Sequence, residues 1–398
     1  MTQPAYRPRL IILILLTAVS TLSLNMFTPS LANIAADFEA SWAMVNIAIA
    51  GYLAVVALLQ LFVGPLSDRY GRRPVLLVSL VVFVVASFGC LMATTIESFL
   101  VFRMFQTTVY AGWVLSMAMV RDTSDQREAA TLISLISMAM AIAPMMGPLI
   151  GGSLDLFFGW RANFALYLGL GAFLLLVCMI DLKETNHSRS SSISQQWRSY
   201  PELLGAGRYW GYVMCQSFSV GAFYIFIGGA PLVATAVFGF SAAKLGLIIG
   251  SITAGFAFGA FLSSRLTKGY PLINLIISGR VLASAGLGCG LIHVLSGVVT
   301  PWTVFGATLF VGIGNGLTVP SCSSGYMSVI PRLAGSAAGL AGTMAVATGA
   351  LLTWISGTML TAENGAYMLL GFMLASSFSG LVAILIVRQL ERRKPNQT

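Results

Sequence analysis

The sequence predicts an all-α integral membrane protein whose twelve transmembrane helices form two six-helix bundles. Hydrophobic residues make up 57% of the 398 residues and charged residues only 9%, against about 25% charged in an ordinary soluble domain. Runs of about 20 apolar residues, long enough to cross a bilayer as a helix, follow one another along the chain. Basic residues gather between alternate runs, and one polar stretch divides the runs into two sets of six.

The expected spans are joined by short connections and divide the chain into three parts. They lie near 10–31, 42–64, 74–95, 98–120, 131–152 and 160–182, and then near 209–232, 241–264, 271–294, 300–322, 334–356 and 366–388. We therefore expect an N-terminal bundle at 1–182, a cytoplasmic linker loop at 183–208 and a C-terminal bundle at 209–398. Repeated halves with a site at their interface are a common transporter architecture, so we expect a cavity between the bundles.

The distribution of basic residues predicts the orientation. With a cytoplasmic N-terminus, only Arg161 and Lys244 fall on outer segments, and eighteen basic residues fall on inner ones. The eighteen are Arg7, Arg9, Arg69, Arg72, Arg73, Arg121, Arg127, Lys183, Arg189, Arg198, Arg208, Arg265, Lys268, Arg332, Arg388, Arg392, Arg393 and Lys394. This asymmetry predicts a multi-pass protein of the bacterial inner (cytoplasmic) membrane with both termini in the cytoplasm. It also assigns the net charge of +9 to topology and to contact with anionic membrane lipids, so no nucleic-acid partner is expected.

The most specific motif lies between spans two and three, where the chain reads Gly64-Pro65-Leu66-Ser67-Asp68-Arg69-Tyr70-Gly71-Arg72-Arg73-Pro74. This stretch resembles the corresponding loop of the major facilitator superfamily, which reads G-x-L-S/A-D-R-x-G-R-R/K. The resemblance implies a conformational latch made by Gly64, Asp68, Arg69, Gly71, Arg72 and Arg73. Gly64 would permit close helix approach, and Asp68 would face a helix N-terminus or a cation, with Arg121 and Asp122 as its expected partners. The alternative is an ordinary basic loop that obeys the topology rule.

Span five ends in Pro144-Met145-Met146-Gly147-Pro148-Leu149-Ile150-Gly151-Gly152. This segment resembles the G-P-x-x-G-G motif of the superfamily's antiporters, carried here by Gly147, Pro148, Gly151 and Gly152. Each proline removes a helix hydrogen bond and favours a kink, and the glycines flatten one face for a neighbouring helix, for which span eight is suited. The alternative is generic helix packing with no role in exchange.

A polar stripe on span four is the main candidate for the substrate cavity. Arg103, Gln106, Tyr110 and Trp113 recur at helical spacing, and an arginine inside the membrane needs a cavity or a partner. Arg103 and Gln106 also match the R-x-x-Q-G-x-G pattern of related transporters, although both glycines are missing. To the same cavity we assign Asn25, Gln216, Tyr224 and Asn315. The alternative is a snorkelling Arg103 above an ordinary packing stripe, and we expect Arg280 in span nine to snorkel.

The second half resembles the Bcr/CflA drug-resistance branch of the superfamily, for example at Gly228-Gly229-Ala230-Pro231 and Gly312-Ile313-Gly314-Asn315-Gly316. Many members of that branch of drug:proton antiporters carry an acid in span one, in a D-x-Y-x-P pattern associated with the proton or a cationic drug. Here the stretch is Asn25-Met26-Phe27-Thr28-Pro29, and asparagine cannot titrate. The thirteen acids all lie at or near predicted span ends. Asp37 and Asp155 are the remaining candidate proton carriers, and plain surface carboxylates are the alternative.

These features predict a secondary transporter and not an enzyme, because the two histidines and thirteen acids supply no catalytic spacing in mid-membrane. The resemblance implies export of small drug-like amphiphiles by alternating access, coupled to protons. The missing acid disfavours strongly cationic substrates. The alternative is a carrier for a small metabolite, such as a nucleoside, an amino-acid derivative or a siderophore, in either direction and without proton coupling. We expect a monomer that meets a small-molecule substrate, protons and membrane lipids, with no cofactor and no metal.

Overall fold

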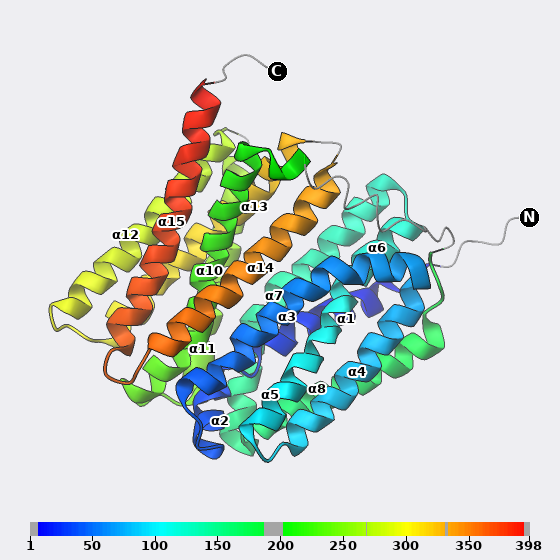
Figure 1. The fold of residues 1–398 in the computed structure, drawn as a ribbon, viewed down its shortest axis with the longest axis horizontal. Coiled ribbons are helices and arrows are strands. Elements are labelled where there is room, and N and C mark those ends of the chain that lie inside the picture. The colour runs from blue at the N-terminus through cyan, green and yellow to red at the C-terminus, as the bar shows by residue number, and fades with distance from the viewer. Residues whose placement is uncertain (1–6, 187–201, 268, 331–332, 394–398) are drawn as a thin grey trace, which may run out of the picture. The chain divides into compact units, whose positions relative to one another are not determined.

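The computed structural model describes residues 7–186, 202–267, 269–330 and 333–393 (Figure 1). Part of the expected linker, residues 187–201, lies outside this range. So do five of the basic residues used to predict the orientation, which are Arg189, Arg198, Lys268, Arg332 and Lys394.

The chain folds as two compact units. Residues Met1–Ile193 and Ala242–Gly246 form the first, and Ser194–Ser241 and Leu247–Thr398 form the second. The helices of the first unit are α1 (Leu10–Asn25), η1 (Thr28–Ser30), α2 (Leu31–Asp37), α3 (Trp42–Tyr70), α4 (Arg72–Met92), α5 (Ile96–Phe105), η2 (Gln106–Tyr110), α6 (Ala111–Thr123), α7 (Gln126–Phe158) and α8 (Arg161–Asp181). Within this unit α1 packs on α7, and α4 packs on α8.

The second unit is built around α10, which packs against α13, α14 and α15. Its elements are α10 (Gly207–Ala236), α11 (Ala242–Leu266, with its first turn assigned to the first unit), α12 (Leu272–Leu295), η3 (Trp302–Gly306), α13 (Ala307–Val329), α14 (Ala334–Met359) and α15 (Gly365–Arg393). The helix α12 completes this bundle by packing on α13 and α15.

The prediction of an all-α membrane fold with twelve spans is confirmed. The described residues contain no strand, and ten of their helical stretches are long and apolar enough to cross a membrane. The interrupted stretch from Ile96 to Thr123 and the helix α7 bring the series to twelve. The helix α7 (Gln126–Phe158) begins five residues before the span expected at 131–152 and ends six residues after it.

Two spans that were expected to be continuous are interrupted by short 3₁₀ segments. In the first span the interruption follows α1, where Pro29 has no N–H to give to the carbonyl of Asn25. The Thr28 hydroxyl donates to that carbonyl instead, at 2.7 Å. In the fourth span the side chains of Thr107 and Thr108 donate to the carbonyls of Met104 and Phe105, at 2.6 and 2.9 Å. Hydroxyl groups that bond the backbone in this way compete with regular helix geometry.

An ion pair joins the first and last helices of each unit. In the first unit, Arg9 lies 3.2 Å from Asp181 at the end of α8. In the second unit, Arg208 at the start of α10 lies 2.8 Å from Glu391 near the end of α15. All four side chains are at least partly exposed, so each pair contributes at most about 1 kcal/mol. Their equivalent positions show that the two bundles close in the same way.

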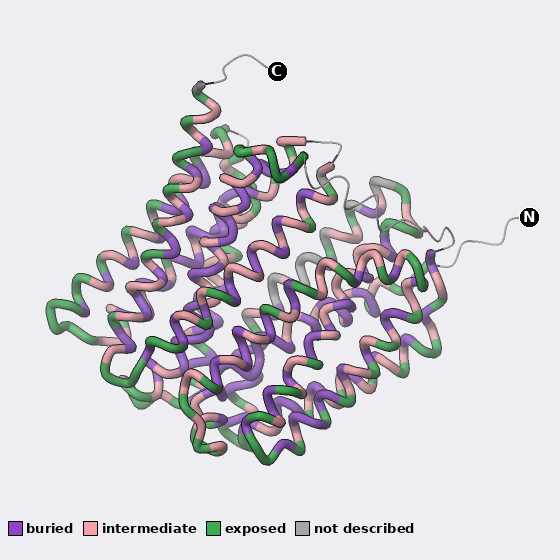
Figure 2. The backbone as a smooth tube through the Cα atoms, viewed as in Figure 1, coloured by how far each residue is buried: buried purple, intermediate pink, exposed green. Residues whose placement is uncertain are grey.

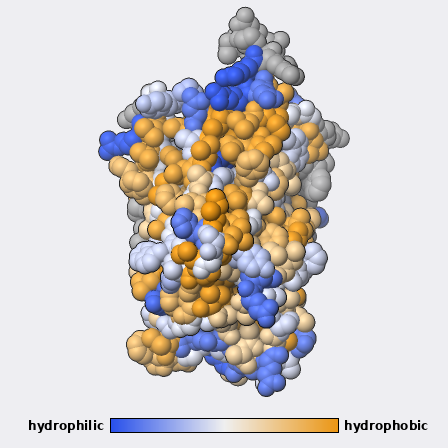
Figure 3. All heavy atoms as spheres, turned by 90° about the vertical axis from the view of Figure 1, so that its left-hand side faces the viewer, coloured by the Kyte–Doolittle hydropathy of each residue, from blue (hydrophilic) through white to orange (hydrophobic). Residues whose placement is uncertain are grey.

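Exposed apolar side chains cover the outer faces of the helices. Burial alternates along each helix (Figure 2), and one face of the molecule is mostly hydrophobic, with hydrophilic side chains gathered mainly toward its two ends (Figure 3). Exposed members on α12 and α15 are Val281, Ile292, Leu295, Phe378, Val382, Leu385 and Ile386. Apolar surface of this extent needs a hydrocarbon solvent, which agrees with a membrane protein.

Candidate functional site

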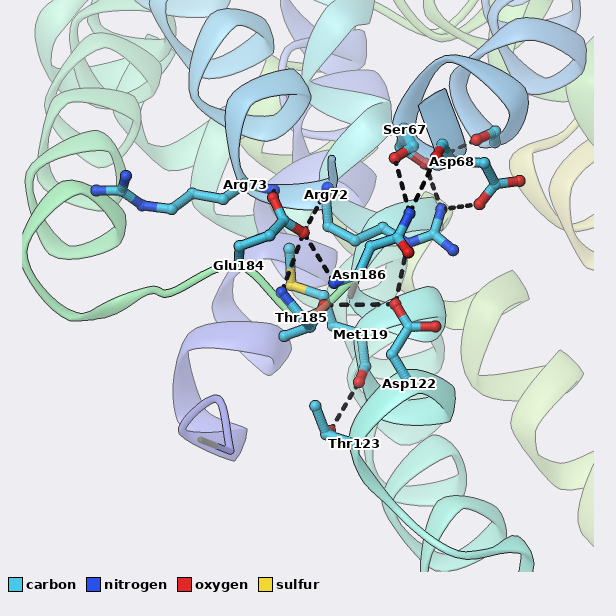
Figure 4. A network of polar contacts seen from close by, with 11 residues as sticks. Ser67, Asp68, Arg72, Arg73, Met119, Asp122, Thr123, Glu184, Thr185 and Asn186 are labelled. Atoms are coloured by element: carbon cyan, nitrogen blue, oxygen red, sulfur yellow. Dashed lines mark hydrogen bonds and ion pairs between the residues drawn. The ribbon is translucent and has the colours of Figure 1, made fainter. Parts of the chain in front are cut away.

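The tight turn between α3 and α4 carries the expected latch motif, and its geometry depends on a segment far away in sequence. A helix end leaves backbone groups without intrahelical partners. Glu184, just after α8, accepts hydrogen bonds from the N–H groups of Arg72 and Arg73 at 2.9 and 3.2 Å. Asn186 donates to the carbonyl of Asp68 at 3.1 Å. The segment Glu184–Asn186 therefore satisfies the end of α3 and the start of α4 together (Figure 4).

Gly71 makes this arrangement possible. Its φ of +104° favours glycine, and a Cβ at this position would overlap the Glu184 carboxylate. Partial burial raises the pKa of Glu184, but the N–H groups of Asn186, Arg72, Arg73 and Thr185 outweigh it, and the pKa lies below its usual value. The carboxylate is therefore held in its charged form against the positive end of the α4 dipole.

Arg72 is the cation at the centre of the turn that carries the latch motif. Its guanidinium lies 2.5 Å from Asp68 and 3.0 Å from Asp122, and it donates to the Ser67 hydroxyl. Figure 4 shows these contacts. The Arg72 side chain is only 11% exposed, so they are partly shielded from water. The expected pairing of Asp68 with Arg121 does not form. Arg72, one turn after Asp68, pairs with it instead, and Arg121 is exposed.

The other latch residues have simpler surroundings. Arg73 donates to the carbonyl of Met179 at 2.9 Å, which fixes α4 to α8. Arg69 is exposed and lies over the Tyr70 ring at 5.3 Å. A Cβ on Gly64 would meet no atom within 4 Å among the described residues, so the close helix approach expected there is absent from this structure.

Two glycines of the antiporter-like motif pack α7 against α1, and Gly152 packs it against Ala242 in the first turn of α11, the span expected as its neighbour. A Cβ on Gly147 would lie 3.1 Å from the Leu22 side chain, and one on Gly151 would overlap the carbonyl oxygen of Met26. Pro148 and Gly152 are buried in the same stretch of α7. The expected flat face is therefore present, and Gly151 places α7 directly against the interruption of the first span.

Arg103 and Gln106 lie inside the first unit, where both side chains are fully buried. Arg103 donates to the Ser23 carbonyl at 2.7 Å and to Gln106 at 2.8 Å, and its guanidinium lies 4.1 Å from the Phe27 ring centroid and 4.2 Å from that of Tyr52. These contacts replace water around a buried cation. In this conformation neither Arg103 nor Gln106 can touch a solute, and the snorkelling alternative does not apply.

The three other expected cavity residues of this unit are partly or fully buried. Tyr110 and Trp113 are partly buried and form a T-shaped pair at 5.2 Å. The Trp113 indole N–H has no acceptor among the described residues. Asn25 donates to the Thr21 carbonyl at 2.9 Å, but its Oδ1 receives no hydrogen bond from any described residue. One donor and one acceptor are therefore left over.

One expected residue of the second unit, Asn315, binds a buried arginine. Arg280 is fully buried and donates to Asn315 at 2.7 Å and to Thr318 at 2.9 Å, so the prediction that it snorkels is wrong. Gly279 and Gly314 explain the difference, because a Cβ on either would crowd the facing backbone and they let α12 and α13 approach closely. Asn315 is thereby occupied as a ligand of Arg280.

The remaining two residues of that set lie nearby along α10. Gln216 is 7% exposed and accepts a hydrogen bond from Ser323 at 3.2 Å. Tyr224 is partly buried and packs over Gly349 of α14, where a Cβ would overlap its ring. Both therefore join α10 to its neighbours within the second unit.

The two candidate proton carriers have different environments. Asp37 accepts hydrogen bonds from Arg161 at 2.7 Å and from the Trp160 indole at 3.2 Å, and its side chain is 44% exposed. Asp155 is only 7% exposed and accepts a hydrogen bond from Asn33 at 2.7 Å. Asp37 therefore fits the alternative of a surface carboxylate, and Asp155 does not.

Sequence reasoning missed Glu184 and Asn186. Both follow a predicted span as part of a polar linker, where a carboxylate and an amide are ordinary. A usable indication was present in Gly71-Arg72-Arg73, because a helix that starts after glycine has no capping side chain of its own.

Comparison with known proteins places this arrangement in a family. The sequence profile described as Major Facilitator Superfamily matches residues 13–353. The chain is 30% identical over 374 residues to "Multidrug resistance protein MdtL" of Escherichia coli O45:K1 (strain S88 / ExPEC), covering 92% of this chain and 91% of that protein. It is 28% identical over 353 residues to "Uncharacterized MFS-type transporter YdgK" of Bacillus subtilis (strain 168), covering 86% and 87%.

Solved structures show the same fold at low sequence identity. A bacterial homolog to the human lysosomal transporter Spinster, inward-facing and unoccupied, matches with a TM-score of 0.79 at 16% identity over 96% of each chain. A D-xylose-proton symporter matches with a TM-score of 0.77 at 14% identity over 95% of this chain and 96% of the other. With a profile match over most of its length and a relative at 30% identity, this multi-pass membrane chain belongs to the Major Facilitator Superfamily of transporters.

Proposed function

We propose that this transporter exports small amphiphilic molecules, uncharged or anionic, from the cytoplasm across a bacterial inner membrane in exchange for protons. The relative named as a multidrug resistance protein supports export of drug-like solutes. The latch around Arg72 and the glycines of α7 would serve the alternation between two conformations, and both termini would lie in the cytoplasm.

The middle of each described span contains no acid, and this acid-free interior carries the choice of substrate charge. Each of the thirteen acids lies in a loop or in the first or last turns of a helix. Arg103 and Arg280 are ligated by amide, hydroxyl and carbonyl oxygens, with no carboxylate beside either. A cationic solute would find no counter-ion there and would lose its hydration without compensation. A neutral or anionic solute avoids that cost. The Asn25 Oδ1 and the Trp113 N–H, unpaired among the described residues and buried in this conformation, would offer it hydrogen bonds in a conformation that exposes them.

The test uses purified protein in liposomes with an acidic interior. We expect accumulation of anilinonaphthalene sulfonate and of neutral phenylnaphthylamine, and no accumulation of a trimethylammonium derivative of the same ring system. A protonophore should abolish the accumulation. The matched variant Asn25→Asp places a carboxylate at the interruption of the first span and should admit the cationic probe.

Two results would overturn the proposal. If the rate of transport does not depend on the pH gradient, the proposed exchange for protons is wrong and the alternative of a metabolite carrier is favoured. If the unmodified protein prefers the cationic probe, the conclusion that the acid-free interior selects neutral or anionic solutes is wrong.

A further inference from the structure

Asp155 is a buried carboxylate that faces the interruption of the first span. It lies one helical turn after Gly151, whose position touches the carbonyl of Met26. Its Oδ2 accepts a hydrogen bond from Asn33 of α2 at 2.7 Å, and it also accepts one from the Ser30 hydroxyl of η1. Asp155 therefore fixes both segments that follow the interruption to α7.

No described basic side chain pairs with Asp155. The segments α1 and η1 carry no charged residue. The nearest charged groups on α2 and α8 are Asp37 and Arg161, which pair with one another at 2.7 Å. Lys244, on the turn of α11 assigned to this unit, is exposed. The charged residues of α6, Arg121 and Asp122, lie at the C-terminal end of α6, next to the start of α7. Asp155 lies at the opposite end of α7. Burial without a cation penalises the charged form of a carboxylate.

The hydrogen bonds to Asp155 depend on its charge. Bonds from Asn33 and Ser30 to a carboxylate are charge-assisted and roughly twice as strong as bonds between neutral groups. Ser30 also accepts a hydrogen bond from Asn163 of α8 at 3.2 Å. Protonation of Asp155 would weaken the hold of α7 on η1 and α2, so a single proton changes how three segments of the bundle are joined.

We propose that Asp155 takes up and releases the coupling proton, and that its protonation frees the η1–α2 segment to move against α7. This assignment rests on the proposed proton exchange. The step is a proton transfer alone: the proton binds one carboxylate oxygen, and no other bond forms or breaks. Asp37 fits the role less well, because it forms an ion pair with Arg161 at 2.7 Å and its side chain is 44% exposed.

The experiment separates transport driven by a pH gradient from exchange of probe without a gradient. Both are measured with anilinonaphthalene sulfonate in proteoliposomes. Asp155→Asn cannot titrate, so its gradient-driven accumulation should fall to the level seen without a gradient, while exchange continues. Asp155→Glu should keep the driven transport. The matched control Asp37→Asn, at the same end of the bundle, should remain driven.

A second readout distinguishes titration from a structural role. Asn33 donates to the charged carboxylate, so Asn33→Ala should move the midpoint of the pH dependence of driven transport upward by about one unit. Driven transport in Asp155→Asn would overturn the assignment. So would loss of exchange in Asp155→Asn without rescue by Asp155→Glu. Absence of gradient-driven transport in the unmodified protein would instead overturn the proposed proton exchange, which this assay detects separately.

Discussion

At the scale of single residues, Glu184 shows how one carboxylate can organise a turn. It binds the free N–H groups at the start of α4 and the N–H groups of its own following residues. Four such bonds lower the pKa of Glu184 in the folded protein. The stabilisation is therefore present above the ordinary range for glutamate and is lost as the pH falls through the lowered value.

Glu184→Gln should lower the free energy of unfolding at neutral pH by about 1 kcal/mol, because the amide lacks the charge that faces the helix dipole. The measurement is the thermal unfolding of the detergent-solubilised protein. The difference from the unmodified protein should shrink when the pH falls below the range in which Glu184 is charged. The control is Glu363→Gln, at an exposed loop position. Equal effects of both substitutions would contradict the assignment of Glu184 as the cap of α4.

The two buried arginines show what residue type alone does and does not predict. Their presence in apolar runs correctly predicted that each needs ligands or a route to the surface. Whether an arginine binds internal ligands or reaches the surface depends on which polar atoms come within about 3 Å of its guanidinium. The packing of the bundle determines which atoms these are. Gln106 lies one turn from Arg103, on the stripe that was predicted to line the cavity, whereas Asn315 reaches Arg280 from another helix.

At the scale of elements, the sequence predicted the spans far better than their interruptions. Apolar length is a property of about twenty consecutive residues, so errors at single positions average out. The interruptions at Thr28–Ser30 and Gln106–Tyr110 depend on a few local hydrogen bonds, made by hydroxyl groups that are equally common in continuous helices. Pro29 was the one residue that marked such a site in advance.

The contact between α7 and α1 gives the clearest prediction at this scale. Gly151→Ala should separate the helices near Met26, because the added Cβ would overlap a backbone carbonyl that cannot move alone. We expect a loss of stability of at least about 1 kcal/mol, with reduced transport. Gly64→Ala is the matched control, since open space surrounds that position and alanine favours a helix by up to about 1 kcal/mol. Thermal unfolding of both variants measures the difference in stability, and transport is compared between Gly151→Ala and the unmodified protein. A tolerated Gly151→Ala would contradict the close packing.

At the scale of the whole molecule, the two units repeat one plan with different residues. Each is closed by an ion pair between its first and last helices. Each contains one buried arginine held by a side-chain amide from the fourth span of its bundle. These parallels were invisible in the sequence, because Arg103 lies in the fourth span and Arg280 in the third span of its half. What the sequence did predict, the two sets of six spans and the family, follows from hydropathy and from one loop motif.

The distribution of charge over the chain leads to the last prediction, which concerns orientation. Arg72, Arg73, Arg208 and Arg393 lie at helix ends that the positive-inside rule assigns to the cytoplasm, whereas the connection around Glu363 carries no basic residue. A reporter inserted between residues 190 and 200 should therefore be active only on the cytoplasmic side. A reporter next to Glu363 should be active only on the outside. Alkaline phosphatase and green fluorescent protein fusions at both positions measure this, since the first requires export and the second fluoresces in the cytoplasm. An inverted result at either position would contradict the topology, because the two sites are separated by an odd number of spans and must lie on opposite sides.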